Sequence, residues 1–182
     1  MNIGFAGAVR TATVVLAGLG LMGADNASAP VSGATRDATA TVSSQPLFAA
    51  GFKDFDRTLQ PLAQFKGKPM VVYFWATWCK SCKQEVPDLI ALHKKYGSKI
   101  HVIGISADNT DKVREFAKLN QINYTLLLGS NDAIALSKQL GNSVGGLPFA
   151  VVVDAKGNIV RSLLGETPAG KFEELIRPLI SS

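Results

Sequence analysis

Short apolar runs alternate with longer amphipathic segments along most of the chain. The runs "MVVYFW" (70–75), "KIHVIGIS" (99–106) and "YTLLLG" (124–129) have the length and composition of buried strands. The segments between them, 80–96 and 110–120, place apolar side chains at helical spacing and indicate amphipathic helices. We therefore expect a chain that returns repeatedly to one sheet, each time through a helix.

The last third of the sequence adds a helix, a hairpin and a second helix. "NDAIALSKQLG" (131–141) predicts a helix, and "FAVVVDAKGNIVRSLLG" (149–165) predicts two strands joined by a turn. "TPAGKFEELIRPLI" (167–180) predicts a final helix capped by Thr167, as Thr110 is the expected cap of the earlier one. Alternating elements followed by a hairpin predict an α/β fold, in which helices flank a mixed central β-sheet.

Residues 1–29 have the layout of an export signal. Arg10 precedes the apolar stretch "TATVVLAGLGLMGA" (11–24), which is shorter than the roughly 20 residues that a transmembrane helix needs. An A-x-A pattern ends at Ala29, but Pro30 follows it and disfavours cleavage at that bond. We expect a signal peptide removed at another bond; the alternative is an N-terminal segment kept as a membrane anchor.

Residues 30–45 are rich in Ala, Ser, Thr and Gly, a composition that predicts a flexible linker. The rest of the chain, 46–182, has the length of a single domain. At its start, "LFAAGFKDFDRTLQPLAQFKGKP" (47–69) predicts an edge strand and a loop.

Both cysteines of the chain lie in "WATWCKSCKQEVP" (75–87), where the predicted strand meets the predicted helix. The free N–H groups and the positive dipole end of a helix stabilise a thiolate, and Cys79 is placed to gain most. Cys82 lies one turn later and can resolve a mixed disulfide formed on Cys79. A disulfide between Cys79 and Cys82 would close a loop too short to stabilise the folded state much. The position of the pair therefore predicts dithiol–disulfide exchange.

Other functions fit the sequence less well. The net charge of +5 comes from scattered basic residues, without a basic run interleaved with aromatic residues, so nucleic acid is not an expected partner. A structural zinc site needs four ligands, and His93 and His101 lack the spacing of a second ligand pair. Haem attachment requires a histidine directly after Cys82, where the residue is Lys83. We expect neither a metal nor a cofactor.

Glu85 and the tryptophans surround the pair in sequence. Glu85 follows Cys82 by three positions, on the same helix face. Spacing alone leaves two interpretations: a solvated surface glutamate, or a carboxylate that raises the pKa of Cys82 or carries its proton. Trp75 and Trp78 are expected to pack around and shield the active sulfur, although Trp75 also fits simple core packing.

The segment "VVYFWATWCKSCKQEVP" resembles the active-site region of the thioredoxin superfamily, and more narrowly of exported TlpA/ResA/CcmG-type thiol–disulfide oxidoreductases. The resemblance extends from Leu59 to the C-terminus. Residues 101–129 occupy the place of the central insert of this family, and "GGLPFAVVVDAKGNIV" (145–160) resembles the segment that carries its cis-proline. The resemblance implies a thioredoxin-like fold with a TlpA-type insert.

By position, the resemblance makes Cys79 the nucleophile, Cys82 its buried partner and Glu85 the acidic residue near both. It makes Pro148 the cis-proline that faces the cysteines, so that the backbone around Leu147 can pair with an extended substrate. The predicted substrate-binding residues are therefore Trp78, Leu147 and Pro148.

Three features depart from the family pattern. Tyr73 stands where cytosolic thioredoxins place a buried aspartate, which would leave proton handling to Glu85 alone. The Lys80-Ser81 dipeptide lacks the proline of many relatives, and this dipeptide tunes the reduction potential. The segment before Leu59 resembles the N-terminal hairpin of the family only weakly.

The resemblance implies a reductase in the periplasm, or on the extracytoplasmic face of the inner membrane, re-reduced by a membrane-bound thiol donor. Its expected substrates are exported cysteine-containing proteins such as apocytochrome c. One alternative is an oxidant that donates disulfides, distinguished by its reduction potential. Another is a thioredoxin-fold binding or chaperone module, which would still work after replacement of Cys79 and Cys82 by alanine.

Overall fold

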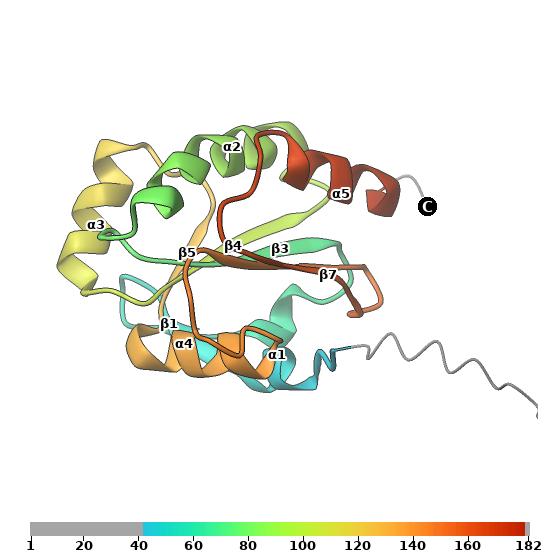
Figure 1. The fold of residues 1–182 in the computed structure, drawn as a ribbon, viewed down its shortest axis with the longest axis horizontal. Helices are drawn as coiled ribbons and strands as arrows, with labels where there is room; N and C mark the ends of the chain where they lie inside the picture. Colours follow the sequence, from blue (N-terminus) through green and yellow to red (C-terminus); the bar gives the residue numbers. More distant parts are fainter. Residues whose placement is uncertain (1–41, 181–182) are drawn as a thin grey trace, which may run out of the picture. The chain divides into compact units, whose positions relative to one another are not determined.

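The computed structural model describes residues 42–180, which form a seven-stranded mixed sheet with helices on both faces (Figure 1). The strand order is β2-β1-β5-β4-β3-β6-β7. This arrangement confirms the predicted fold class. The expected signal peptide or anchor at 1–29, and most of the linker expected at 30–45, lie outside the described residues.

The centre of the sheet consists of strands that are buried on both faces. β3 (Met70–Trp75) pairs in parallel with β4 (His101–Ser106), which pairs in parallel with β5 (Thr125–Leu128). On its other side β3 pairs antiparallel with β6 (Phe149–Val153), and β7 (Ile159–Leu164) completes the terminal hairpin. Every residue of β3 and β6 is buried, which explains their unbroken apolar sequences.

Helices α2 (Lys80–Tyr96), α3 (Thr110–Leu119) and α5 (Lys171–Ile180) contribute to the hydrophobic core on one face of the sheet. Helices α1 (Gln45–Ala49) and α4 (Ser130–Gln139) contribute to the core on the other. Figure 1 shows α2 and α5 opposite α1 and α4. No helix of the described part of the chain is long and apolar enough to cross a membrane.

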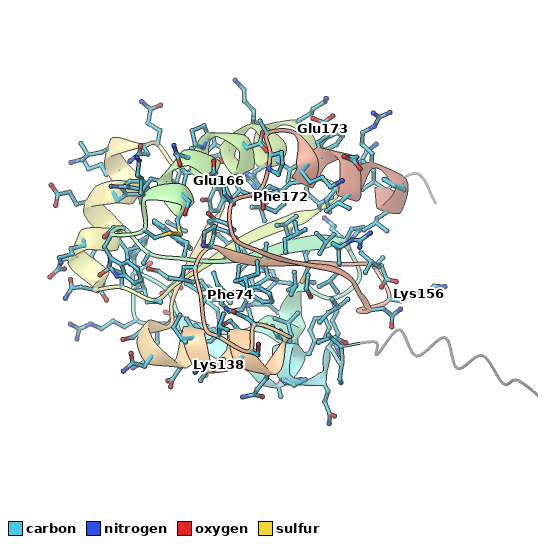
Figure 2. All side chains as sticks on the ribbon, viewed as in Figure 1. Phe74, Lys138, Lys156, Glu166, Phe172 and Glu173 are labelled. Atoms are coloured by element: carbon cyan, nitrogen blue, oxygen red, sulfur yellow. A yellow bond between two sulfur atoms is a disulfide. The ribbon has the colours of Figure 1, made fainter. Side chains whose placement is uncertain are left out.

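Successive residues of β3 supply the two cores in turn, because neighbouring side chains of a strand point to opposite faces. Tyr73 and Trp75 belong to the core under α2 and α5, and Phe74 to the core over α4. Figure 2 shows Phe172 of α5 and Phe74 on opposite sides of the sheet. The side that holds Tyr73 also receives the cysteine-bearing helix.

The N-terminal edge of the sheet is a hairpin, where the sequence predicted a single edge strand and a loop. β1 (Gly51–Lys53) pairs antiparallel with β2 (Leu59–Pro61), and the 3-10 helix η1 (Leu62–Phe65) follows. The Asp54 carboxylate holds the turn by accepting the N–H groups of Asp56 and Thr58, both at 2.9 Å. Strands of three residues are too short to show a hydrophobic period.

Two predicted helix caps were wrong. Asn109, not Thr110, caps α3, because its side-chain oxygen accepts the N–H of Asp111 at 2.9 Å. Helix α5 begins at Lys171 rather than next to Thr167. The N–H of Thr167 donates to a side chain of α2, which holds the segment before α5 in a loop.

Candidate active site

Cys79 and Cys82 form a disulfide at the first turn of α2. Cys79 occupies the N-cap position with extended backbone angles, and its Sγ accepts the N–H of Cys82 at 3.2 Å. The two sulfurs differ in access: Cys79 is 7% exposed, whereas Cys82 is 0% exposed. An incoming disulfide can therefore reach only Cys79.

Groups around Cys79 favour negative charge on its sulfur. The Cys82 N–H points at this sulfur from the helix terminus, where the dipole also favours an anion. The Ser81 hydroxyl lies 3.6 Å from Cys79 Sγ, within hydrogen-bonding range of sulfur. Lys80 and Lys83 are exposed and add only a screened positive field. Once the disulfide is reduced, these groups stabilise a Cys79 thiolate.

Glu85 is buried, with 4% of its surface exposed, so its interpretation as a solvated surface residue is wrong. Its Oε1 accepts the N–H of Thr167 at 2.6 Å, and its Oε2 has no hydrogen-bond partner in the described structure. Burial raises the pKa of Glu85 above its usual range, against the lowering effect of the Thr167 hydrogen bond and of the nearby Tyr73 hydroxyl. Glu85 can therefore accept and release a proton closer to neutral pH than an exposed glutamate.

Tyr73 lies beneath the cysteine helix and is fully buried. Its hydroxyl donates to the carbonyl oxygen of Cys82 at 3.1 Å. Burial, and then the nearby Glu85 carboxylate, raise the pKa of Tyr73 far above its usual value, so the phenol keeps its proton. Tyr73 therefore remains a hydrogen-bond donor to the Cys82 carbonyl at every physiological pH, and its hydroxyl lies near Glu85.

The Leu147–Pro148 peptide bond is cis, as the resemblance implies. Pro148 is buried, and its carbonyl oxygen accepts the N–H of Gly165 at 2.9 Å. Leu147 is half-buried, and among the described residues neither its N–H nor its carbonyl oxygen has a hydrogen-bond partner. In the loop before β6, Leu147 therefore presents free backbone groups next to the cis-proline.

The two tryptophans have different surroundings. Trp75 is fully buried, and its ring centre lies 5.4 Å from that of Phe116, so it belongs to the core. Trp78 is 66% exposed and adjoins Cys79 in the chain, so it is available for contact with another molecule. Most of the Trp78 surface is exposed, so Trp78 packs less against the protein than the sequence analysis expected.

The loop that carries Trp78 is fixed by Asp108, which the sequence analysis missed. One Asp108 oxygen, Oδ2, accepts the N–H of Thr77 at 3.1 Å and also the Thr77 hydroxyl. Burial alone would raise the pKa of Asp108, but hydrogen bonds from Thr77 and Asn109 outweigh it and lower the pKa. Asp108 follows β4, and the ends of adjacent parallel strands lie at one edge of a sheet, which is the signal that could have indicated it.

Comparisons with known proteins agree with this geometry. Residues 45–162 match the AhpC/TSA family. The thiol–disulfide oxidoreductase ResA of Bacillus thuringiensis subsp. konkukian is 32% identical over 120 residues, covering 65% of this chain and 67% of ResA. The thiol:disulfide interchange protein DsbE of Pseudomonas aeruginosa is 34% identical over 118 residues, covering 64% and 62%.

Solved structures show the same fold. A thioredoxin-family thiol:disulfide interchange protein of Chlorobium tepidum has a TM-score of 0.65 and 25% identity, covering 72% of this chain and 92% of that protein. A secreted disulfide oxidoreductase of Mycobacterium tuberculosis has a TM-score of 0.63 and 20% identity, covering 77% and 100%. With its paired cysteines at the start of α2, the chain belongs to the AhpC/TSA family and is a thioredoxin-fold thiol–disulfide oxidoreductase of the ResA and DsbE type.

Proposed function

We propose that this protein reduces disulfide bonds in exported proteins. The observation that carries the proposal is the buried carboxylate of Glu85, which lies one helical turn after the fully buried Cys82. A dithiol protein is a strong oxidant when its reduced, thiolate form is stabilised. The groups around Cys79 stabilise its thiolate and so favour the reduced form. We propose that Glu85 outweighs them, because a buried acid with one unpartnered oxygen disfavours a second negative charge nearby and so favours the disulfide form of the enzyme. A pair that favours its disulfide form donates electrons to its substrate.

The reaction then proceeds in two exchanges. The Cys79 thiolate attacks one sulfur of the substrate disulfide; a bond forms between Cys79 and that sulfur, and the other substrate sulfur leaves as a thiolate. Cys82 next passes its proton to Glu85 and attacks Cys79 Sγ. The bond to the substrate breaks, its second sulfur leaves as a thiolate, and both substrate thiolates take protons from water. Two electrons have passed to the substrate, and Cys79 and Cys82 are joined.

A polypeptide substrate is held by Trp78, Leu147 and Pro148. The exposed Trp78 ring offers a flat apolar surface beside Cys79. The free N–H and carbonyl groups of Leu147 can bind an extended segment as one strand binds another. This arrangement explains how a protein with a barely exposed sulfur can select a disulfide within a longer chain.

The proposed location is the periplasm or the extracytoplasmic face of the inner membrane. The export layout of residues 1–29 supports it, and two similar solved proteins are described as secreted. Suitable substrates there are exported cysteine-containing proteins, with apocytochrome c as the specific candidate. A membrane-bound thiol donor would return the enzyme to its dithiol form by the same exchange run in reverse, with Glu85 returning the proton to Cys82.

The test is to trap the first intermediate. Cys82→Ser leaves Cys79 able to attack but removes the resolving thiol. The full chain with this substitution, expressed in a bacterium that exports it, should accumulate disulfide-linked adducts on non-reducing gels, which mass spectrometry can identify. The double variant Cys79→Ser, Cys82→Ser is the control and should form none. A Cys82→Ser protein that is exported and folded but forms no adducts contradicts the proposal.

A further inference from the structure

The loop before Pro148 is anchored by a buried amide, Asn142. Apart from tyrosine and tryptophan, four polar or charged side chains of the described structure are buried: Glu85, Ser106, Ser137 and Asn142. Glu85 belongs to the active site, and Ser137 and Asn142 contact each other. Burial of an amide is unfavourable unless its hydrogen bonds are satisfied, so the partners of Asn142 indicate what it holds in place.

Asn142 grips both backbone groups of a single residue. Its Nδ2 donates to the carbonyl oxygen of Gly146 at 2.8 Å, and its Oδ1 accepts the N–H of Gly146 at 3.1 Å. The second N–H of the amide donates to the Ser137 hydroxyl at 3.1 Å. The Ser137 hydroxyl in turn donates to the carbonyl oxygen of Ile134 at 2.8 Å, one turn earlier in α4. The amide therefore ties Gly146 to a helix packed on the sheet.

Gly146 immediately precedes Leu147, so the two hydrogen bonds from Asn142 fix the N-terminal side of Leu147. The backbone groups of Leu147 itself stay free. The bond from the Gly165 N–H to the Pro148 carbonyl fixes the other side. We infer that Asn142 is a positioning residue, which holds Leu147 ready to pair with a polypeptide substrate. The inference rests on the proposed substrate site at Leu147.

We call the two hydrogen bonds between Asn142 and Gly146 the Asn142 clamp. Its physical advantage is that it orders the loop before a substrate binds. A mobile loop loses conformational freedom when a substrate orders it, and that loss weakens binding. A loop already held by Asn142 loses less. The clamp does not touch Cys79 or Cys82, so it affects the binding of an extended substrate and not the exchange chemistry of the sulfurs.

The test compares two substrates on Asn142→Ala. Insulin, with dithiothreitol to recycle the enzyme, reports on reduction of a polypeptide disulfide. The small disulfide 5,5′-dithiobis(2-nitrobenzoate), which has no peptide backbone, reports on sulfur chemistry alone. We expect kcat/KM for insulin to fall about tenfold, equivalent to ~1.4 kcal/mol, mainly through KM. The rate with the small disulfide and the reduction potential should not change.

Two controls separate the clamp from general destabilisation. Ser137→Ala leaves both bonds to Gly146 in place and should reduce insulin turnover less than Asn142→Ala does. Leu140→Val disturbs the buried apolar contacts of the same segment without touching Gly146, and should lower stability while the ratio of the two activities stays at the wild-type value.

Trp78→Ala, in the same assays, distinguishes the two ways in which the inference can fail. Insulin reduction that falls for Trp78→Ala but not for Asn142→Ala overturns the clamp and leaves the substrate site standing. Wild-type insulin reduction in both variants overturns the substrate site, and the clamp with it. An equal loss of both activities in Asn142→Ala also overturns the clamp, because it shows a general structural role.

Discussion

Replacing Glu85 by glutamine should make the protein more stable relative to wild type as the pH rises. Because burial raises the pKa of Glu85 in the folded state, the folded protein holds this proton after the unfolded chain, with a glutamate pKa of about 4.3, has released it. Wild-type stability therefore decreases as the pH rises from about 4.3 to the raised pKa, and the penalty is constant above it. Glu85→Gln removes the titrating group and keeps its shape.

Proton linkage limits how fast the stability difference between Glu85→Gln and wild type can grow with pH. A difference of one bound proton changes the free energy of unfolding by at most ~1.4 kcal/mol per pH unit, so the gap between variant and wild type should widen by up to that slope. Glutamine can still accept the Thr167 N–H through its Oε1. Glu85→Ala removes the charge and this acceptor together. Its curve should run parallel to that of Glu85→Gln but lie lower by about 1 to 3 kcal/mol, because the Thr167 N–H then loses its partner.

The assay is urea unfolding followed by far-ultraviolet circular dichroism between about pH 4 and pH 8. Every protein is kept in the disulfide form, so that the cysteines do not titrate. The contrary result is that the free energies of unfolding of wild type and Glu85→Gln change in parallel over this range. That result would mean that Glu85 has the same pKa in the folded and unfolded states. Its assignment as the proton carrier for Cys82 would then be refuted.

Two further substitutions test the surroundings of the sulfurs. Ser81→Ala removes the hydroxyl 3.6 Å from Cys79 Sγ, and should slow alkylation of reduced Cys79 by iodoacetamide at neutral pH about tenfold; an unchanged rate would show that this hydroxyl does not stabilise the thiolate. Tyr73→Phe removes the donor to the Cys82 carbonyl and should lower the free energy of unfolding by about 1 kcal/mol. It should also move the Glu85 titration to higher pH, because the Tyr73 hydroxyl lowers the pKa of Glu85; a shift to lower pH would contradict that role.

The main elements of the fold could be predicted because their patterns are local. The apolar sequence of β3 and the helical spacing of residues 80–96 are visible in short windows, and α2 spans Lys80–Tyr96 as predicted. The placement of Cys79 at the helix start followed from that boundary alone. The three-residue strands β1 and β2 gave no such pattern, and only their pairing in the folded protein defines them.

Features of the site that depend on distant segments could not be predicted. The bond between Glu85 and Thr167 joins positions 82 residues apart, and it brings the segment before α5 against the carboxylate. Helical spacing indicated the face on which Glu85 lies but not what covers that face. Asn142 differs, because its partners are only four and five residues away; it gave a weak signal, an asparagine after Gly141 in a loop without hydrophobic period.

The reduction potential of the Cys79–Cys82 pair tests the central claim most directly. It can be measured by equilibrating the purified domain in dithiothreitol or glutathione buffers and quantifying the free thiols. A reductase, as proposed, should give a value near that of thioredoxin, about −270 mV. A value near that of the strong oxidant DsbA, about −120 mV, would contradict the account, because the protein would then donate disulfides instead of removing them.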